Sequence, residues 1–429
     1  MARGGHGEAS TSDRSHSTQN DWADVHGRHF YLGNLGDLQG AGNGSGSCLP
    51  TGTKVELSMY ATSLVCLFPG EECPLILQRY VARTLVHKVC AAPRPYTRLF
   101  GIAYCSFDSL ACGGVGCTVE LVQVGDLRVC YHPSNDGEDL VDDTDDADGQ
   151  DNVSLVVRVH QRFEHGPLEA FGVLPRVVCT ILDDSPPGRI PPQVMARTSF
   201  WEKRFYRPYN AYALCDRARE LFSKLFPGEA AGISRAAHDP VRLSFLVASR
   251  LPASSIKKQQ RLLEMDVTAR LGAEVELMTR MTQVKELCCA NCGRVLADSR
   301  DIFSMTKEGS SGVFVNGAGA LHDIVTITKV DGVTKVGRPS FEHSWFPGYM
   351  WTIILCNCGM HLGWYFSGNS LLERRPGIDP PLVFFGIRRV ALAVPRASES
   401  DEEQEGSDSE DDDYSDGGDE YENDLEPEN

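Results

Sequence analysis

The sequence has no long apolar run. Although 41 % of its 429 residues are apolar, it contains no window of about 18 apolar residues that could cross a membrane. The N-terminal stretch MARGGHGEASTSDRSHSTQND offers no apolar segment that would serve as a secretory signal. We therefore expect a protein of the cytoplasm and nucleus, without membrane association, whose 15 cysteines are reduced thiols and not a disulfide framework.

Basic patches and phosphate loops are also missing. No cluster of Lys and Arg is interleaved with aromatic residues, so nothing indicates nucleic-acid binding. No GxxxxGK[ST] motif is present, which argues against a nucleotide-hydrolysing enzyme. The net charge of −18 comes from one segment, because residues 397–429 hold 17 acidic residues and no Lys or Arg. We expect this acidic tail, like residues 1–27, to be disordered.

Strand patterns dominate residues 28–200. Short apolar runs such as VELSMYATSLVCLF, LFGIAY and VSLVVRVHQRF alternate with turns, and one helix is expected at about Leu77 to Val89. An acidic stretch, Asn135 to Asp151, is expected to be a solvated loop between two strands. The pattern predicts a mostly antiparallel β domain.

Helical spacing replaces the strand pattern in residues 201–283. Asp239 followed by Pro240 has the form of a helix cap with proline at the first helical position. A further helix, starting near Ser254 or Ser255, carries one apolar stripe from Ile256 to Met278 over about seven turns. The stripe is either the internal core of a helical unit or a docking face.

Two close cysteine pairs predict a metal site in residues 284–396. Cys289 and Cys292 form a CxxC pair followed by glycine, and Cys356 and Cys358 form a CxC pair. Four thiolates from two turns are the usual ligands of one structural Zn²⁺. If the second pair stays extended, both of its side chains share one strand face. Free thiols or a disulfide are the alternatives, and His361 or Cys288 could replace one ligand.

Three of the five tryptophans lie between Gly337 and Phe366. A proline and a Pro-Gly turn interrupt this stretch, so neither one helix nor one strand can carry all three rings to a single face. The rings must converge from different elements, and convergent aromatics with a few polar groups hold small neutral ligands. Ordinary core packing is the alternative. The residues of this aromatic box would be Trp345, Trp351, Trp364 and Phe366, with His343 and Ser344 as polar groups.

The motifs HSWFPGYxW and HLGWYF, with the CxxC pair upstream, resemble the C-terminal zinc domain of the cereblon family. These proteins are substrate receptors of cullin-4 RING ubiquitin ligases, and this domain is also called CULT or thalidomide-binding. LFPGEECPLIL and LFGIAY are similar to the Lon N-terminal domain that the family also carries. The resemblance implies a Lon N-terminal-like β domain at 28–200, followed by a helical segment at 201–283. Residues 284–396 would form a β-tent, a domain in which two sheets meet at an angle and are held together by one zinc ion. The ends are 1–27 and 397–429.

The resemblance also implies a ligand and partners. In the family, a cage of three tryptophans and a phenylalanine binds a cyclic imide, whose natural form would be a cyclised C-terminal Asn or Gln of a client protein. Asn316, His343 and Ser344 match its polar positions. The helical segment would dock on the β-propeller adaptor, the damaged-DNA-binding protein. Two departures are that Gly317 and Ala318 replace the Pro-His that follows Asn316 in the family, and that the second cysteine pair is one residue shorter.

Three classes of function compete. A non-catalytic receptor would bind ligand in the aromatic box and leave ubiquitin transfer to other ligase subunits. An enzyme related to methionine sulfoxide reductases would need a reactive cysteine near the end of its domain, and no cysteine follows Cys358. A zinc-stabilised scaffold would use no ligand at all. Within the first class, an aromatic cage for a small cation is the alternative to an imide site.

Overall fold

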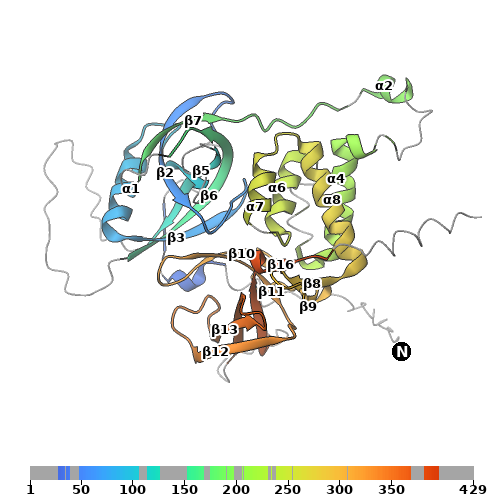
Figure 1. Ribbon diagram of the computed structural model, residues 1–429. Coiled ribbons are helices and arrows are strands. Elements are labelled where there is room, and N and C mark those ends of the chain that lie inside the picture. Colours follow the sequence, from blue (N-terminus) through green and yellow to red (C-terminus); the bar gives the residue numbers. More distant parts are fainter. Residues whose placement is uncertain are drawn as a thin grey trace, which may run out of the picture. The chain divides into compact units, whose positions relative to one another are not determined.

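In the computed structural model (Figure 1), the described residues are 28–33, 35–38, 48–105, 114–125, 152–168, 174–189, 191–197, 205, 207–229, 233, 238–253, 255–306, 308–368 and 381–395. The expected tails, 1–27 and 397–429, lie outside these residues, and so does the expected acidic loop up to Asp151. The domain ranges given above therefore stay predictions.

Five strands close on themselves as a barrel, in the order β5, β4, β2, β7, β6 and back to β5. β3 is added along β6 and β1 along β5. Only the β2–β4 pair is parallel, so the expectation of a mostly antiparallel domain is confirmed. The strands are β1 (Gly36–Asp37), β2 (Lys54–Thr62), β3 (Glu72–Gln78), β4 (Leu99–Tyr104), β5 (Gly114–Val124), β6 (Asn152–His165) and β7 (Arg176–Ile181).

Helix α1 (Arg79–Ala91) follows β3 directly and lies beside the barrel in Figure 1. The helix predicted at Leu77 to Val89 is thus confirmed to within two residues at each end. Val81, Leu85 and Val89 recur every four residues and are all buried, which gives α1 one apolar stripe.

After the short helix α2 (Pro192–Arg197), four longer α-helices follow in the described residues, and a residue with a polar side chain caps three of them. Asn210 caps α4 (Ala211–Leu225), and Asp239 caps α6 (Pro240–Arg250) by accepting from the backbone N–H groups of Val241 and Arg242. The predicted Asp-Pro helix start is therefore confirmed. Within the described segments, no helix combines the length and the apolar character needed to span a membrane.

The single long helix expected from Ile256 to Met278 is wrong. The chain forms α7 (Ser255–Leu263) and α8 (Val267–Val284), with a break between them. Asp266 starts α8 by accepting from the Thr268 N–H, and the Glu264 carbonyl accepts from Arg162 Nη1 at 3.1 Å and Arg270 Nη1 at 2.6 Å. A cap and two arginine donors thus satisfy the polar groups that a continuous helix would have paired internally. The Ile256 side chain lies outside the described residues.

Two sheets form the C-terminal part. One has six antiparallel strands in the order β10-β11-β15-β14-β13-β12, and the other has three in the order β16-β8-β9. Two sheets are what the β-tent implied by the resemblance requires, so this part of the expected fold is confirmed. The strands are β8 (Glu286–Cys289), β9 (Val295–Asp298), β10 (Ser311–Val315), β11 (Leu321–Ile327), β12 (Val333–Ser340), β13 (Tyr349–Cys356), β14 (His361–Gly368), β15 (Val383–Arg388) and β16 (Leu392–Ala393).

Asp323, on β11, binds two buried cations. Its carboxylate accepts from Lys258 Nζ on α7 at 2.5 Å and from Arg389 Nε at 2.5 Å. Arg389 also donates to the Ser249 carbonyl of α6, so the cluster joins the helices to the six-stranded sheet. Burial alone raises the pKa of Asp323, but Arg389 and Lys258 outweigh it and hold the pKa below its ordinary value.

We expect Asp323→Ala to lower the free energy of unfolding by about 3–5 kcal/mol, because it leaves two buried cations without a carboxylate. Asp331→Ala is the matched control, since Asp331 pairs with Lys329 at 3.5 Å on the surface with its side chain 74 % exposed, and its cost should stay below about 1 kcal/mol. Denaturant titration of both variants measures the difference. The Asp323 contribution should also be lost only as the pH falls below about 4, because its folded-state pKa is the lower one. Equal stability of the two variants would contradict the structural role of the cluster.

Candidate metal centre and aromatic ligand site

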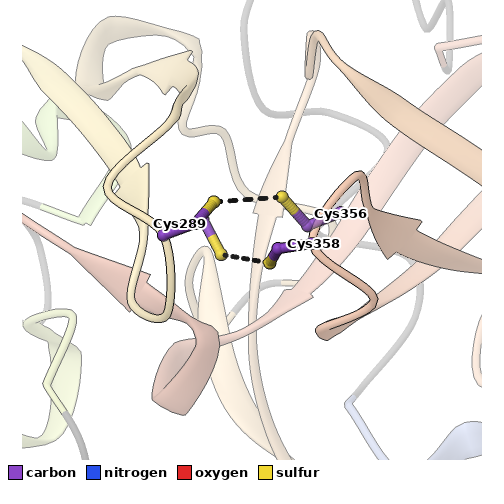
Figure 2. A group of neighbouring side chains, drawn as sticks. Cys289, Cys356 and Cys358 are labelled. Atoms are coloured by element: carbon purple, nitrogen blue, oxygen red, sulfur yellow. Dashed lines mark hydrogen bonds between the residues drawn. The ribbon is translucent and has the colours of Figure 1, made fainter.

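Four cysteines from two turns come together. Cys289 ends β8 and Cys292 lies in the turn to β9, while Cys356 ends β13 and Cys358 lies in the turn to β14. Their Sγ atoms all lie within 4.8 Å of one another. Figure 2 shows the sulfurs of the first turn facing those of Cys356 and Cys358. One turn belongs to the three-stranded sheet and the other to the six-stranded sheet, so the centre connects the two sheets.

The sulfur spacing fits a tetrahedral zinc ion. The Cys289 and Cys358 Sγ atoms are 3.7 Å apart, and so are those of Cys292 and Cys356. In a tetrahedron with Zn–S distances of about 2.3 Å, neighbouring sulfurs lie about 3.8 Å apart. Four soft thiolate donors without a place for water are the ligand set of a structural site. The predicted cofactor, one structural Zn²⁺, is therefore confirmed.

Polar groups beside Cys358 favour its thiolate form, whereas burial raises the pKa of the Cys356 thiol. Asn291 Nδ2 donates to Cys358 Sγ at 3.5 Å, and this bond, with one from the Met360 backbone, lowers the pKa of Cys358 to about 6. The Gly359 N–H donates to the Cys356 carbonyl at 2.8 Å and closes the turn. Despite the shortened spacing, the Cys358 thiolate thus keeps donors that orient it.

The second pair does not reach the metal as an extended strand. β13 ends at Cys356, and residues 357–359 form a turn in which Gly359 has a φ of 84°. The extended segment that would let both thiols share a strand face is therefore not formed, because the chain reverses direction between them. The two candidate substitutes lie outside the cluster: His361 Nε2 faces the Gly363 carbonyl at 3.2 Å, and Cys288 lies on β8 opposite Ala393.

Pairing of β13 with β14 places three of the predicted aromatic residues on one sheet face. Trp351 is opposite Phe366, and Trp364 is two residues before Phe366 on the same strand. Side chains opposite each other or two apart in antiparallel strands share a face. Gly386 of β15 is opposite Trp364, and a Cβ atom on Gly386 would lie 2.9 Å from the Phe366 ring. A glycine is needed there for the ring to lie against the sheet.

Trp345 approaches this face from the loop before β13. Its Nε1 donates to the Val315 carbonyl at 2.9 Å, which fixes the ring. Its ring centroid is 4.6 Å from that of Trp364 with an angle of 71° between the planes, and 6.3 Å from that of Phe366. Trp345 and Trp364 are 6 % and 9 % exposed. The two indoles therefore form a corner, with Phe366 beneath and the half-buried Trp351 on the same sheet face.

The polar residues predicted for the site have other roles as well. Asn316 Oδ1 accepts from the N–H groups of Ala318 and Ala320 and closes the β10–β11 turn. His343 has a φ of 53°, and its ring covers Gly317, where an added Cβ would lie 2.7 Å from it. His343 and Ser344 also line a pocket of about 730 Å³, which is bounded by Phe30, Tyr31, Gly33, Phe341, Pro347, Gly348 and Tyr349. None of the four box aromatics lines that pocket.

Two histidines lie at the tryptophan corner: sequence reasoning missed His322 and considered His361 only as a possible zinc ligand. The His322 ring centroid lies 4.8 Å from that of Trp364 and 5.6 Å from that of Trp345, and His361 lies 5.0 Å from Trp364. Burial, then the charge of Arg388, lowers the pKa of His322 to about 4 and also lowers that of His361. Both rings are therefore neutral at pH 7. His322 and Ile324 are two residues apart on β11, a spacing that indicates a shared sheet face. This spacing does not reveal which strand lies next to β11.

Cys358→Ser should release the zinc and destabilise the C-terminal sheets by several kcal/mol, because metal binding contributes folding free energy. Cys288→Ala is the matched control, since this neighbouring thiol is buried but outside the cluster. Metal analysis of both purified variants should give no zinc and one zinc per chain, respectively. A full zinc content in the Cys358 variant would show that another residue completes the site.

Comparison with known proteins gives three findings. The Yippee–Mis18 family model, described as Yippee zinc-binding/DNA-binding and Mis18, centromere assembly, matches residues 286–370. The N-terminal domain of a Lon protease from the Mycobacterium avium complex aligns with a TM-score of 0.34 and 17 % identity, over 52 % of this chain and 98 % of that one. A score this low carries no further argument.

The third finding concerns cereblon. The chain is 32 % identical to the protein cereblon of Gallus gallus over 210 residues, 33 % to that of Xenopus tropicalis over 215 residues, and 36 % to that of Danio rerio over 171 residues. These alignments cover 48 %, 50 % and 39 % of this chain and 44 %, 45 % and 37 % of those proteins. The chain thus spans less than half the length of the curated relatives it matches. Over about half of its own length, the chain is similar in sequence to cereblon, and its zinc-binding region matches the Yippee–Mis18 family model.

Proposed function

We propose that this chain is a cereblon-like substrate receptor that binds a cyclic imide and recruits client proteins to a cullin-4 RING ubiquitin ligase. The observation that carries the proposal is the corner of Trp345 and Trp364, with Phe366 below and Trp351 on the same face of a sheet joined to the four-cysteine centre. The homology to cereblon supports the same reading.

The aromatic corner suits a small flat ring. Indole faces and a phenyl ring contact such a ligand through dispersion and apolar burial, worth about 2–3 kcal/mol before ordering costs. An imide has two carbonyl groups and one N–H, and the backbone around His343 and Trp345 would pair with them, with the His343 side chain donating to a carbonyl. The natural ligand would be the imide formed when a C-terminal Asn or Gln cyclises.

A small cation in the aromatic cage is the second candidate ligand. Cages for cations are commonly strengthened by a carboxylate, but the nearby Glu342 is 79 % exposed and 3.6 Å from His343 Nε2. The charged side chain beside the tryptophan corner is instead Arg388, next to His361. A positive charge at this place disfavours a cationic ligand and supports the imide.

The receptor itself would be non-catalytic. In this proposal the helices α4 to α8, in the segment 201–283, dock on the β-propeller damaged-DNA-binding adaptor, and the ligase supplies ubiquitin transfer. The protein would act in the cytoplasm and nucleus. The remaining alternative is a zinc-stabilised scaffold outside any ligase, in which the same aromatic rings serve only as core.

Trp351→Ala should weaken the binding of 3-acetamidoglutarimide to the full-length chain by about tenfold, because it removes one aromatic wall without opening the buried corner. Tyr365→Ala is the matched control, since Tyr365 lies on the neighbouring position of β14 and points to the opposite face. Calorimetric titration measures both affinities, with thermal unfolding to check the fold. No binding of the imide to the wild-type chain at millimolar concentration would contradict the ligand proposal.

Affinity purification of the tagged full-length chain from lysate of its own organism tests the ligase proposal separately. The propeller adaptor and a cullin-4 should be identified by mass spectrometry among the co-purifying proteins. If imide binding holds but neither subunit is recovered, the chain is a ligand-binding module outside the ligase.

A further inference from the structure

Arg388 lies on the aromatic face of the six-stranded sheet. It ends β15 and is opposite Ile324 of β11, while Gly386, two residues earlier, is opposite Trp364 of β14. Residues two apart on a strand share a face, so Arg388 and Trp364 are on the same side of the sheet. The next residue, Arg389, faces the other side and binds Asp323.

The two consecutive arginines differ in their partners. Arg389 is fully buried and neutralised by Asp323, whereas Arg388 is half-buried and has no carboxylate partner in the described part of the chain. Arg388 Nη1 lies 3.4 Å from both Nδ1 and the carbonyl oxygen of His361, and these are its only side-chain contacts with polar atoms of the described residues. A guanidinium has five N–H donors, so most of them are available to a ligand.

Partial burial makes this charge costly without an anion. Burial lowers the pKa of Arg388, which shows that its surroundings disfavour the charge, although an arginine stays protonated at neutral pH. A carboxylate that accepts two N–H bonds from the guanidinium would offset this cost and add a charge-assisted pair.

His361 lies between Arg388 and the aromatic corner and contacts both. Arg388 contacts His361, and the His361 ring contacts Trp364 edge to face with centroids 5.0 Å apart. His322 contacts the same indole from β11, and Asn316 Nδ2 lies 3.4 Å from His322 Nε2. Because both histidines are neutral at pH 7, Arg388 is the positive charge that a ligand would meet at this edge, as far as the described residues show.

We propose that Arg388, with His361 beside it, is a subsite for a peptide carboxylate next to the imide site, and that it selects clients with Asp or Glu immediately before the cyclised C-terminal residue. The inference rests on the proposed function, because it needs the imide ring in the aromatic corner. A peptide leaving that corner past Trp364 would bring its next side chain to Arg388. The carboxylate would accept from the Arg388 Nε and Nη2 groups, which no described residue occupies.

Two peptides that differ only in the side chain before the cyclised C-terminal residue test the proposal. Both are acetylated and end in the glutarimide formed from a cyclised Gln, and the preceding residue is Glu in one and Gln in the other. The full-length wild-type chain should bind the Glu peptide about five- to tenfold more tightly, as expected for one charge-assisted pair at a half-buried site. Calorimetric titration at fixed ionic strength measures both affinities.

Arg388→Gln should remove this preference by weakening the Glu peptide alone, while the affinity for the Gln peptide changes less than about twofold. Arg338→Gln is the matched control, because Arg338 is an exposed arginine on β12, an edge strand of the same sheet. This control carries the same change in net charge and should keep the wild-type preference.

Two results would overturn the inference and leave the proposed function standing. One is equal affinity of the wild-type chain for the two peptides, and the other is a Glu preference that survives in Arg388→Gln. If the wild-type chain binds neither peptide, the imide site itself is refuted, and the carboxylate subsite with it.

Discussion

The four-thiolate centre is the constraint on which the C-terminal half depends. The Cys289 turn belongs to a sheet of three short strands, and the Cys356 turn belongs to a sheet of six. Neither sheet is large, and the buried cluster around the centre contains residues of both, including Leu287, Ile354 and Leu392. A metal ion that binds both turns contributes folding free energy, which compensates for the small apolar area that this core buries.

The aromatic site follows from this constraint through β13 and β14. The metal holds the hairpin turn between these strands, and their register then places Trp351, Trp364 and Phe366 on one face. Close approach of β14 and β15 completes the arrangement, since a Cβ on Gly363 would collide with the Gly386 carbonyl oxygen. Phe366 can then stack on Phe384 at 4.9 Å with an angle of 15° between the planes. The aromatic face is therefore set by backbone geometry and not by the tryptophans alone.

Local signals in the sequence predicted much of this structure. The Asp239-Pro240 cap, the helix near Leu77 and the cysteine set depend on residues close in sequence or on spacings with one chemical meaning. The break at Asp266 was missed because the apolar stripe continues across it, and a cap on one side outweighs helical periodicity. The backbone shape of the Cys356–Cys358 pair was left open, because CxC spacing is equally compatible with a strand and a tight reversal.

The contacts of Arg388 could not be predicted for a different reason. They require β15 to lie between β11 and β14, and strand order in a sheet is not encoded in any one strand. The same holds for the approach of His322 on β11 to Trp364 on β14, because these two strands do not pair with each other. His361, in contrast, lies three residues before Trp364 on β14 itself. The position of the charged side chain in the site therefore depends on long-range strand pairing. Local sequence motifs were enough to identify the metal ligands and the aromatic rings.

Hydrogen exchange of the full-length chain before and after zinc chelation tests most directly whether the aromatic face depends on the metal centre. The account predicts that chelation removes the protection of backbone amides in β13, β14 and β15, while the barrel strands β4, β5 and β6 keep theirs, since their closed pairing does not involve the metal. Unchanged protection of β13 to β15 in chain shown to be free of zinc would contradict the claim that the metal centre holds the aromatic face in place.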